Sequence, residues 1–201
     1  MTQFLDKAYA ARDAASTRAL YDDWAASYEA EVSENGYATP ARCAEALKSF
    51  TDDMQQPVLD FGCGTGLSGL ALRLAGFETL DGVDLSAEML AGARAKGVYR
   101  HLNQIEAGGP LPRDGYTLIA AIGVIGAGAA PISVLHTLMS ALPRGGKLVF
   151  SFNDHALEDP ANEGGVSEWT DCGAARLLFK EHGAHLPGID LKSNVYALEK
   201  A

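Results

Sequence analysis

The sequence is poor in cysteine and in basic residues. Its three cysteines, Cys43, Cys63 and Cys172, stand far apart and form no Cys-x-x-Cys pair, so neither a disulfide framework nor a thiolate metal site is indicated. The 16 lysines and arginines face 26 acidic residues, which gives a net charge of −10. Because such a surface repels phosphate groups, nucleic acid is an unfavourable partner for this chain.

The sequence also lacks long apolar runs and clusters of metal ligands. No stretch approaches the roughly 20 apolar residues of a membrane-spanning helix, and the N-terminus has no basic segment ahead of an apolar one. No group of His, Asp and Glu has the spacing of a metal site. With 201 residues, 47% hydrophobic and 21% charged, the chain suits one ordinary soluble domain. We therefore expect a cytoplasmic protein with no membrane partner and no metal.

The most informative segment is 58–66, which reads Val-Leu-Asp-Phe-Gly-Cys-Gly-Thr-Gly. A strand-like apolar stretch leads into three alternating glycines, and a helical pattern follows over 67–75, so a ligand can approach bare backbone in a βαβ unit. A second strand, expected over 79–84, ends at Asp84. About 20 residues between glycine loop and acid suit a carboxylate that binds ribose hydroxyls. The sequence therefore predicts a cofactor with an adenosine group and Asp84 at its ribose; Asp81, in mid-strand, is the weaker alternative.

The phase of the glycines separates two such cofactors. Gly64, Gly66 and Gly69 satisfy the Gly-x-Gly-x-x-Gly pattern of dinucleotide-binding folds. That pattern starts two residues late, however, because the expected strand ends at Phe61 and the turn begins at Gly62. The phase favours a loop of Gly62, Gly64 and Gly66, and an NAD(P)-dependent oxidoreductase that uses the later glycines is the alternative.

In this phase, the loop and the preceding Asp60 resemble the acid-x-Gly-x-Gly-x-Gly signature of class I S-adenosylmethionine-dependent methyltransferases. The segment Gly-Val-Asp-Leu-Ser-Ala-Glu-Met-Leu at 82–90 is similar to their second motif. The resemblance implies S-adenosylmethionine as cofactor and S-adenosylhomocysteine as product. It also implies an α/β fold: a Rossmann-like, doubly wound, seven-stranded sheet, mostly parallel, with an antiparallel last strand.

The resemblance further implies roles for single residues in and after the loop. The three loop glycines would admit the methionine part of the cofactor, and Asp60 would fix its amino end. Leu85 and Met89 would pack near the adenosine, although Met89 is equally well explained as a core residue of its helix. Cys63 would lie beside the cofactor, or serve as a small apolar filler, as buried cysteines commonly do.

A third motif is less regular. In relatives of this fold an acid-Leu pair after the third strand accepts the adenine amino group. The segment Ile-Glu-Ala-Gly-Gly-Pro-Leu-Pro at 105–112 places Glu106 and Ala107 at that position. An exposed glutamate before a glycine turn is the alternative interpretation.

An aromatic segment precedes the glycine loop. Tyr-Asp-Asp-Trp-Ala-Ala-Ser-Tyr at 21–28 resembles a signature of many small-molecule methyltransferases, above all the methyltransferase-like family that includes the Williams–Beuren-region protein. In such enzymes this helix closes over the cofactor, which implies that Tyr21, Trp24 and Tyr28 contact it, and aromatic faces suit a positive sulfonium. The same residues at i, i+3 and i+7 also form an apolar stripe that docks a helix on the sheet, and both interpretations can hold together.

The methyl acceptor is the least defined part of the prediction. The segment that starts at Ile122 is apolar and rich in glycine, which counts against N-methylation of adenine or glutamine type and suggests close approach to the cofactor or an apolar substrate. Asn153, Asp154 and His155 are the candidates for substrate contact, with His155 as a possible general base, and an exposed polar loop is the alternative. We expect an enzyme that methylates a small molecule by direct in-line transfer, with a non-catalytic S-adenosylmethionine-binding protein as a further alternative.

The remaining pattern predicts how the chain is organised. Residues 1–201 form one expected methyltransferase domain, with a helical extension over 1–50 and a Rossmann-like core over 57–201. Apolar runs separated by helical patterns argue for a parallel sheet covered on both faces. Strands are expected at 99–104, 116–122 and 147–152, helices from 86 to 96 and at 131–142 and 168–182, and an antiparallel pair at 184–190 and 192–198.

Overall fold

The computed structural model describes residues 14–111, 115–126 and 129–201. The expected helical extension therefore begins outside the described residues, and two residues of the glycine-rich segment after Ile122 also fall outside them. Within the described part of the chain, no helix has the length and apolar character required to cross a membrane.

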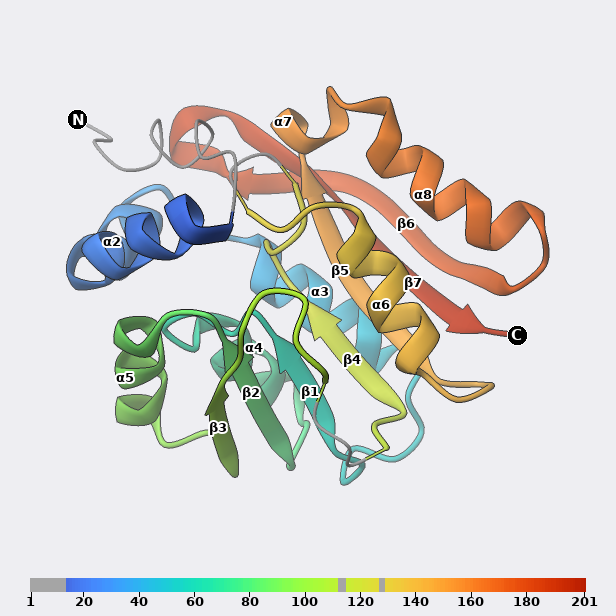
Figure 1. Ribbon diagram of the computed structural model, residues 1–201, viewed down its shortest axis with the longest axis horizontal. Helices are drawn as coiled ribbons and strands as arrows, with labels where there is room; N and C mark the ends of the chain where they lie inside the picture. Colours follow the sequence, from blue (N-terminus) through green and yellow to red (C-terminus); the bar gives the residue numbers. More distant parts are fainter. Residues whose placement is uncertain (1–13, 112–114, 127–128) are drawn as a thin grey trace.

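A seven-stranded sheet forms the centre of the molecule, in the order β3-β2-β1-β4-β5-β7-β6 (Figure 1). Five strands follow one another in parallel, and β7 runs antiparallel to its neighbours β5 and β6. The predicted seven-stranded, mostly parallel sheet with an antiparallel last strand is confirmed. The strands are β1 (Val58–Phe61), β2 (Leu80–Asp84), β3 (His101–Gln104), β4 (Leu118–Ala121), β5 (Lys147–Asn153), β6 (Ala175–Leu186) and β7 (Leu191–Lys200).

Helices cover both faces of the sheet. On one face, Leu135 and Leu138 of α6 and Val166 of α8 pack on Ile119 and Phe150. On the other face, α3 and α4 pack through buried leucines on β1 and β2. Burial of these apolar faces is what holds the layers together. The helices are α2 (Ala14–Glu34), α3 (Thr39–Lys48), α4 (Leu67–Ala75), α5 (Ala87–Lys96), α6 (Ser133–Ala141), α7 (Asp154–Leu157) and α8 (Pro160–Asp171), with a 3-10 turn, η1, at Pro187–Ile189.

The prediction of a helix over 168–182 is wrong. Helix α8 begins earlier, at Pro160, and ends at Asp171, and Gly173 turns the chain with φ +74°. The following residues form the long edge strand β6, which pairs with β7. Most of its side chains are exposed or half-buried, so the sequence carries no alternation of apolar and polar residues to reveal a strand. Pairing with β7 decides the conformation instead.

The fold places two segments over the ends of the parallel strands. The loop after β1 lies at the carboxyl edge of the sheet, where open α/β sheets bind ligands. Helix α2 lies beyond the carboxyl ends of β1 and β2, next to α5 (Figure 1). These two segments frame the candidate site.

Candidate functional site

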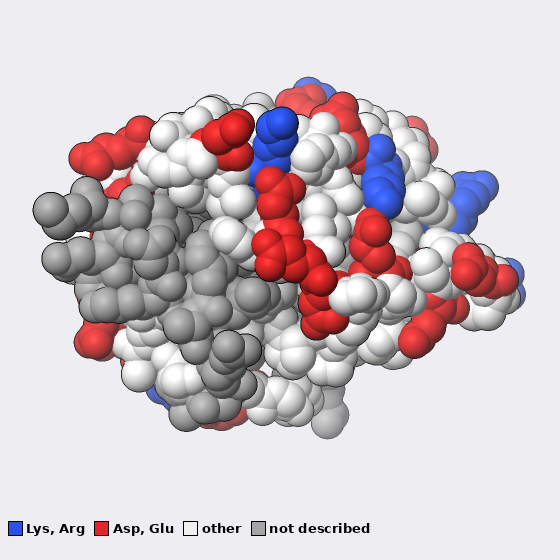
Figure 2. All heavy atoms as spheres, turned by 90° about the horizontal axis from the view of Figure 1, so that it is seen from above, with Lys and Arg blue, Asp and Glu red and all other residues white. Residues whose placement is uncertain are grey.

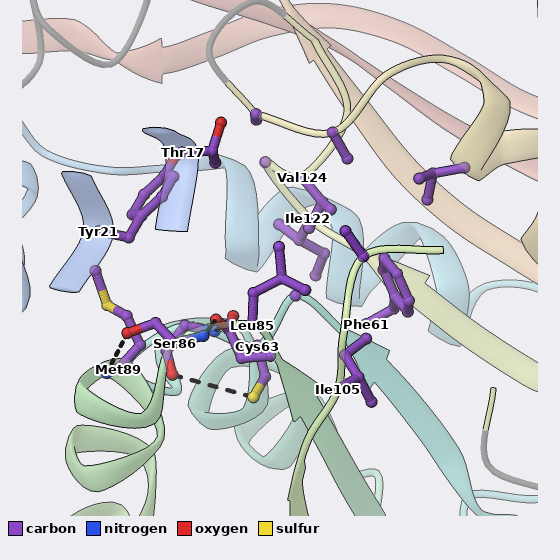
Figure 3. Close-up of a pocket in the computed structure, with 18 of the residues that line it drawn as sticks. Thr17, Tyr21, Phe61, Cys63, Leu85, Ser86, Met89, Ile105, Ile122 and Val124 are labelled. Atoms are coloured by element: carbon purple, nitrogen blue, oxygen red, sulfur yellow. Dashed lines mark hydrogen bonds between the residues drawn. The ribbon is translucent and has the colours of Figure 1, made fainter. Parts of the chain in front are cut away.

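A cavity of about 690 Å³ lies between α2 and the carboxyl ends of β1, β2 and β4. Its volume is within the range of roughly 300–1,000 Å³ typical of small-molecule sites. Figure 3 shows Thr17 and Tyr21 of α2 on one side of it, Ser86 and Met89 on another, and Ile122 and Val124 facing them. The walls are mainly apolar, and the polar groups come chiefly from the loop after β1 and the end of β2.

The three glycines of the loop serve different purposes. All have positive φ, +70° at Gly62, +53° at Gly64 and +92° at Gly66, a region that side chains rarely adopt. A Cβ atom at Gly62 would lie 2.5 Å from Val124 Cγ2, and one at Gly66 would lie 3.1 Å from the Cα atom of Ala93. At Gly64 a Cβ would meet nothing within 4 Å. The loop therefore offers open backbone to a ligand at Gly64, whereas the flanking glycines make room for the protein itself.

Asp84 lines the cavity at the end of β2. Its Oδ2 accepts a 2.8 Å hydrogen bond from the Gly64 amide, and its Oδ1 accepts one of 2.9 Å from the Ser86 amide. Burial raises the pKa of Asp84, and these backbone hydrogen bonds oppose that rise. A carboxylate has about four lone-pair sites. Asp84 is thus fixed in orientation by the backbone and keeps lone pairs for hydroxyl donors.

Asp81, the alternative acid, does not line the cavity. It is buried within β2 and accepts hydrogen bonds from the side chains of Arg100 and Tyr116 and from the backbone of His101. The largest effect on the pKa of Asp81 is burial, which raises it, but the hydrogen bond and charge of Arg100 help to bring the pKa below its usual value. Its hydrogen bonds tie β2 to the start of β3 and the segment before β4.

Asp60 lies behind the glycine loop rather than in the cavity. It is fully buried, and its Oδ2 accepts hydrogen bonds from Ser68 Oγ at 2.7 Å and from Tyr99 Oη at 2.6 Å. Its Oδ1 has no hydrogen-bond partner among the described residues. Burial raises the pKa of Asp60 to about 6.

Tyr99 also explains the glycine that completes the dinucleotide pattern. The amide of Gly69 donates a 3.0 Å hydrogen bond to Tyr99 Oη, and a Cβ atom at Gly69 would lie 2.2 Å from the same oxygen. Gly69 is therefore required for the packing of Tyr99 beneath the loop, and it does not line the cavity.

Helix α2 is attached to the rim of the cavity by polar contacts on one helical face. Arg18 lies 3.5 Å from Glu106, Asp22 accepts a hydrogen bond from Ser86 Oγ, and Glu29 pairs with Lys96. The three α2 residues stand at i, i+4 and i+11, which aligns them along one side of a helix. These contacts hold α2 across α5 and the cavity.

Two aromatic residues of α2 line the cavity, and a third packs behind them. Tyr21 and Tyr28 line the cavity. Trp24 is 2% exposed and packs with Val32 and Leu186, and its ring lies 4.8 Å from that of Tyr28 in an edge-to-face arrangement. Trp24 thus supports the lining tyrosines from behind the main cavity.

Most of the predicted site residues come together around this cavity, although their roles stay predictions. Trp24, Asp60 and Gly66 lie outside its lining, for the packing reasons given above. The lining includes Tyr21, Tyr28, Gly62, Cys63, Gly64, Asp84, Leu85, Met89, Glu106, Ala107 and Ile122.

The polar residues at the end of β5 and in α7 do not line the main cavity. Asn153 Oδ1 caps α7 by accepting from the Ala156 amide, and Asp154 accepts hydrogen bonds that join it to His182 and Lys192. His155 lies in α7, 3.7 Å from Glu158, and does not line the cavity. The structure thus gives these residues local structural contacts and places His155 away from the main cavity.

Sequence reasoning missed several lining residues. Phe61, Thr65 and Ile105 adjoin predicted motifs and could have been found by extending those motifs. Val124 lies in the glycine-rich segment after Ile122, which was expected to approach the cofactor or an apolar substrate. Val134 and Thr17 carry no local signal, because only the folded chain brings their segments together. The missed residues include Thr17, Arg18, Phe61, Thr65, Ile105, Leu111, Val124 and Val134. Among the described residues, no group of three or more His, Cys, Asp or Glu could hold a metal ion.

The fold and the site together define a class I S-adenosylmethionine-dependent methyltransferase. The family model described as a methyltransferase domain matches residues 36–193, and the chain belongs to this family. It is 32% identical over 141 residues to human methyltransferase-like protein 27, covering 66% of this chain and 56% of that protein. These matches confirm the resemblance drawn from the sequence motifs and S-adenosylmethionine as the cofactor.

Other relatives share smaller parts of their length. The ribosomal protein L11 methyltransferase of Shewanella denitrificans is 33% identical over 117 residues, 57% of this chain and 39% of that protein. The chain thus spans between about two fifths and just over half of the length of these curated relatives.

Solved structures agree in fold. Magnesium protoporphyrin IX methyltransferase from Synechocystis with bound S-adenosylmethionine has a TM-score of 0.65 at 17% identity, covering 87% of this chain and 83% of that one. The [4+2]-cyclase SpnF has a TM-score of 0.59 at 15% identity, covering 80% and 81%. Because these identities are low and the named reactions differ, the likeness shows the fold and leaves the substrate open.

Proposed function

We propose that this methyltransferase acts on a small-molecule acceptor by direct in-line methyl transfer inside the covered cavity. The observation that carries the proposal is the position of α2 over the cavity: Thr17 and Tyr21 face the strand ends across it (Figure 3), and Tyr28 also contributes to its lining. An acceptor must fit with the cofactor into about 690 Å³. That space favours a compact molecule over a folded protein or a nucleic acid strand.

The residues of the cavity fit S-adenosylmethionine. Gly64 presents bare backbone, and Asp84 has lone pairs for the ribose hydroxyls. Thr65, next to the loop glycines, also lines the cavity. Leu85 and Met89 supply apolar surface for the adenosine. We assign Tyr21, Tyr28, Gly62, Cys63, Glu106, Ala107 and Ile122 to the same site.

Methyl transfer depends mainly on how the protein positions the donor and the acceptor. When bound, S-adenosylmethionine supplies a methyl group on a sulfonium that is already activated for displacement. The glycine loop and Asp84 hold the donor, and Tyr21 and Tyr28 exclude water and offer aromatic faces to positive charge. Holding donor and acceptor in line supplies much of the rate enhancement. The proposal assigns no general base, and His155, which faces Glu158 in α7, has no part in it.

Two other functions are the rivals. Relatives named as ribosomal protein L11 methyltransferases point to a protein acceptor, and a binding protein without turnover is the second rival. The net charge of −10 argues against nucleic acid. On the described part of the face in Figure 2, acidic side chains lie among neutral ones and the basic ones form no continuous patch. A cytoplasmic location remains a proposal from the sequence.

A transfer assay with radiolabelled S-adenosylmethionine distinguishes these functions. The enzyme is incubated with a panel of small phenols, amines, thiols and carboxylic acids, and in parallel with ribosomal proteins. Labelling of a small molecule, with S-adenosylhomocysteine formed in equal amount, is the expected result. Labelling of protein alone would contradict the proposal, and so would tight binding of S-adenosylhomocysteine without transfer to any member of the panel.

A further inference from the structure

A small recess adjoins the main cavity on the side of β5 and β6. Its volume is about 60 Å³, and it shares Tyr28, Tyr37 and Gly123 with the lining of the main cavity. Among the described residues that line it, the polar side chains include Ser151, Asn153 and His185, and none carries a charged carboxylate, ammonium or guanidinium group. The recess is therefore a neutral polar pocket beside the proposed methyl-transfer site.

His185 is held at this recess by a chain of hydrogen bonds. Its Nδ1 lies 2.7 Å from Thr39 Oγ1, which lies 2.9 Å from Ser193 Oγ. Arg42 Nη1 donates a 3.0 Å hydrogen bond to the same Ser193 oxygen. Thr39 and Ser193 are fully buried, so their hydroxyl hydrogens need acceptors within the protein.

The donor and acceptor in each of these hydrogen bonds follow from Arg42, whose side chain can only donate. Ser193 accepts from Arg42, and among the described residues its hydroxyl hydrogen has Thr39 Oγ1 as its acceptor. The Thr39 hydroxyl then donates to His185 Nδ1. The reverse direction would leave the buried Ser193 hydrogen unsatisfied, which is costly. The proton of the neutral imidazole therefore lies on Nε2, which makes no hydrogen bond within the described structure.

A second donor lines the same recess. Asn153 accepts the Ala156 amide on its Oδ1, which caps α7, and its side-chain NH₂ group supplies two further N–H donors. Tyr37 packs edge-to-face on the His185 ring, with centroids 5.2 Å apart, and fixes its plane. Two neutral donors suit an oxygen acceptor. A buried charge would need an opposite charge beside it, and the nearby Arg42 is already bound to Glu181 and to backbone carbonyls.

The size of the recess limits what can enter. A cavity of about 150 Å³ holds a benzene ring, so a recess of about 60 Å³ takes only a group of a few atoms. The body of the acceptor then remains in the main cavity, next to the glycine loop.

We infer that the recess binds an uncharged oxygen group of the methyl acceptor, a hydroxyl or a carbonyl, and that His185 Nε2–H is the residue group that selects it. The inference rests on the proposed function, because it makes the recess part of the acceptor site. It narrows the acceptor to molecules with a neutral oxygen substituent at one end and disfavours carboxylates and ammonium groups at that end.

The first test uses the wild-type protein and NMR of the ¹⁵N-labelled histidine rings. Two-bond correlations are expected to show His185 protonated on Nε2, and adding benzamide or phenol to the protein saturated with S-adenosylhomocysteine should shift that signal. Benzoate is expected to bind at least tenfold more weakly. An Nδ1-protonated ring, no shift with either neutral probe, or equal binding of benzoate would each overturn the inference.

The second test uses variants on the same strand. His185→Leu should weaken benzamide binding at least tenfold without changing affinity for S-adenosylhomocysteine, whereas His185→Gln, which keeps an N–H donor, should restore much of it. His182→Leu, an exposed histidine on β6, is the matched control and should bind as the wild type does. Unchanged benzamide binding in His185→Leu would overturn the inference while the proposed function stands. Repeating the titration on the free protein tests the recess independently of cofactor binding.

Discussion

The backbone amide of Gly64 donates a 2.8 Å hydrogen bond to the carboxylate of Asp84, across 20 residues of the chain. This bond joins the two motifs that the sequence suggested for the cofactor, one after β1 and one at the end of β2. The open backbone and the acid are therefore held in register by the protein itself. A site arranged in this way spends little binding energy on ordering its own groups.

Gly64→Ala is expected to impair cofactor binding more than folding. A side chain at φ +53° is strained, which costs about 1–2 kcal/mol of stability, and the added methyl group would project into the cavity. Affinity for S-adenosylhomocysteine, measured by calorimetry, should fall at least tenfold by this added obstruction. Gly97→Ala is the matched control, since Gly97 also has positive φ and open space around it but lies at the far end of α5. An equal loss of affinity in both variants would refute the role of Gly64.

Ser86→Ala is expected to affect both stability and binding. Ser86 Oγ caps α5 by accepting from the Met89 amide and also donates to Asp22 of α2. Loss of an N-cap costs about 0.5–2 kcal/mol, and loss of the contact with Asp22 loosens the roof of the cavity. Asp159→Ala, at the N-cap of α8, should cost similar stability by urea unfolding and leave affinity for S-adenosylhomocysteine unchanged. If Ser86→Ala binds S-adenosylhomocysteine as tightly as Asp159→Ala does, the contact between Ser86 and Asp22 does not contribute to cofactor binding.

Asp60→Asn is expected to change the pH dependence of stability. Burial raises the pKa of folded Asp60 from 3.8 to about 6, so between these values the folded state binds a proton that the unfolded state has lost. Stability from Asp60 therefore falls as pH rises through this window, by up to about 3 kcal/mol. The variant should lose this slope in urea unfolding curves between pH 4 and about 6.5.

The pH dependence of stability must be compared between Asp60→Asn and the wild type, because His185 changes stability with pH in the opposite direction. Burial lowers the pKa of His185 from 6.5 to about 4, so its contribution to stability rises with pH over nearly the same window. The two slopes offset each other in the wild type. A difference profile between wild type and Asp60→Asn that is flat with pH would contradict the assignment of Asp60.

Local sequence signals predicted the cofactor half of the molecule well. The bounds expected for the helix over 67–75 match α4, and the Ser86 cap of α5 is as expected. Glycine, acid and capping residues determine local geometry through their own backbone preferences, so a short stretch of sequence is enough to recognise them. The spacing also pointed to Asp84, which lines the cavity; its role at the ribose stays a prediction.

The acceptor half could not be predicted in this way. The pattern over 168–182 predicts a helix, yet the residues from Ala175 onward belong to strand β6, because their conformation depends on pairing with β7. The recess combines Tyr37, Ser151 and His185 from segments far apart in the chain, and no local pattern links them. Asp60 belongs to the expected motif but does not line the cavity. Its carboxylate is bound instead by Tyr99, 39 residues away in the sequence. Tertiary packing, which the sequence pattern does not record, decides these positions.

The central claim, that the cavity beside Gly64 and Asp84 binds S-adenosylmethionine, is tested most directly by calorimetry on wild type and Asp84→Ala. Wild type should bind S-adenosylhomocysteine and give no heat with NAD, and Asp84→Ala should lose about 1–3 kcal/mol of binding free energy, the cost of unpaired polar groups. Asp52→Ala, an exposed acid away from the cavity, serves as the control and should match wild type. Unchanged affinity in Asp84→Ala, or binding of NAD in place of S-adenosylhomocysteine, would contradict the claim.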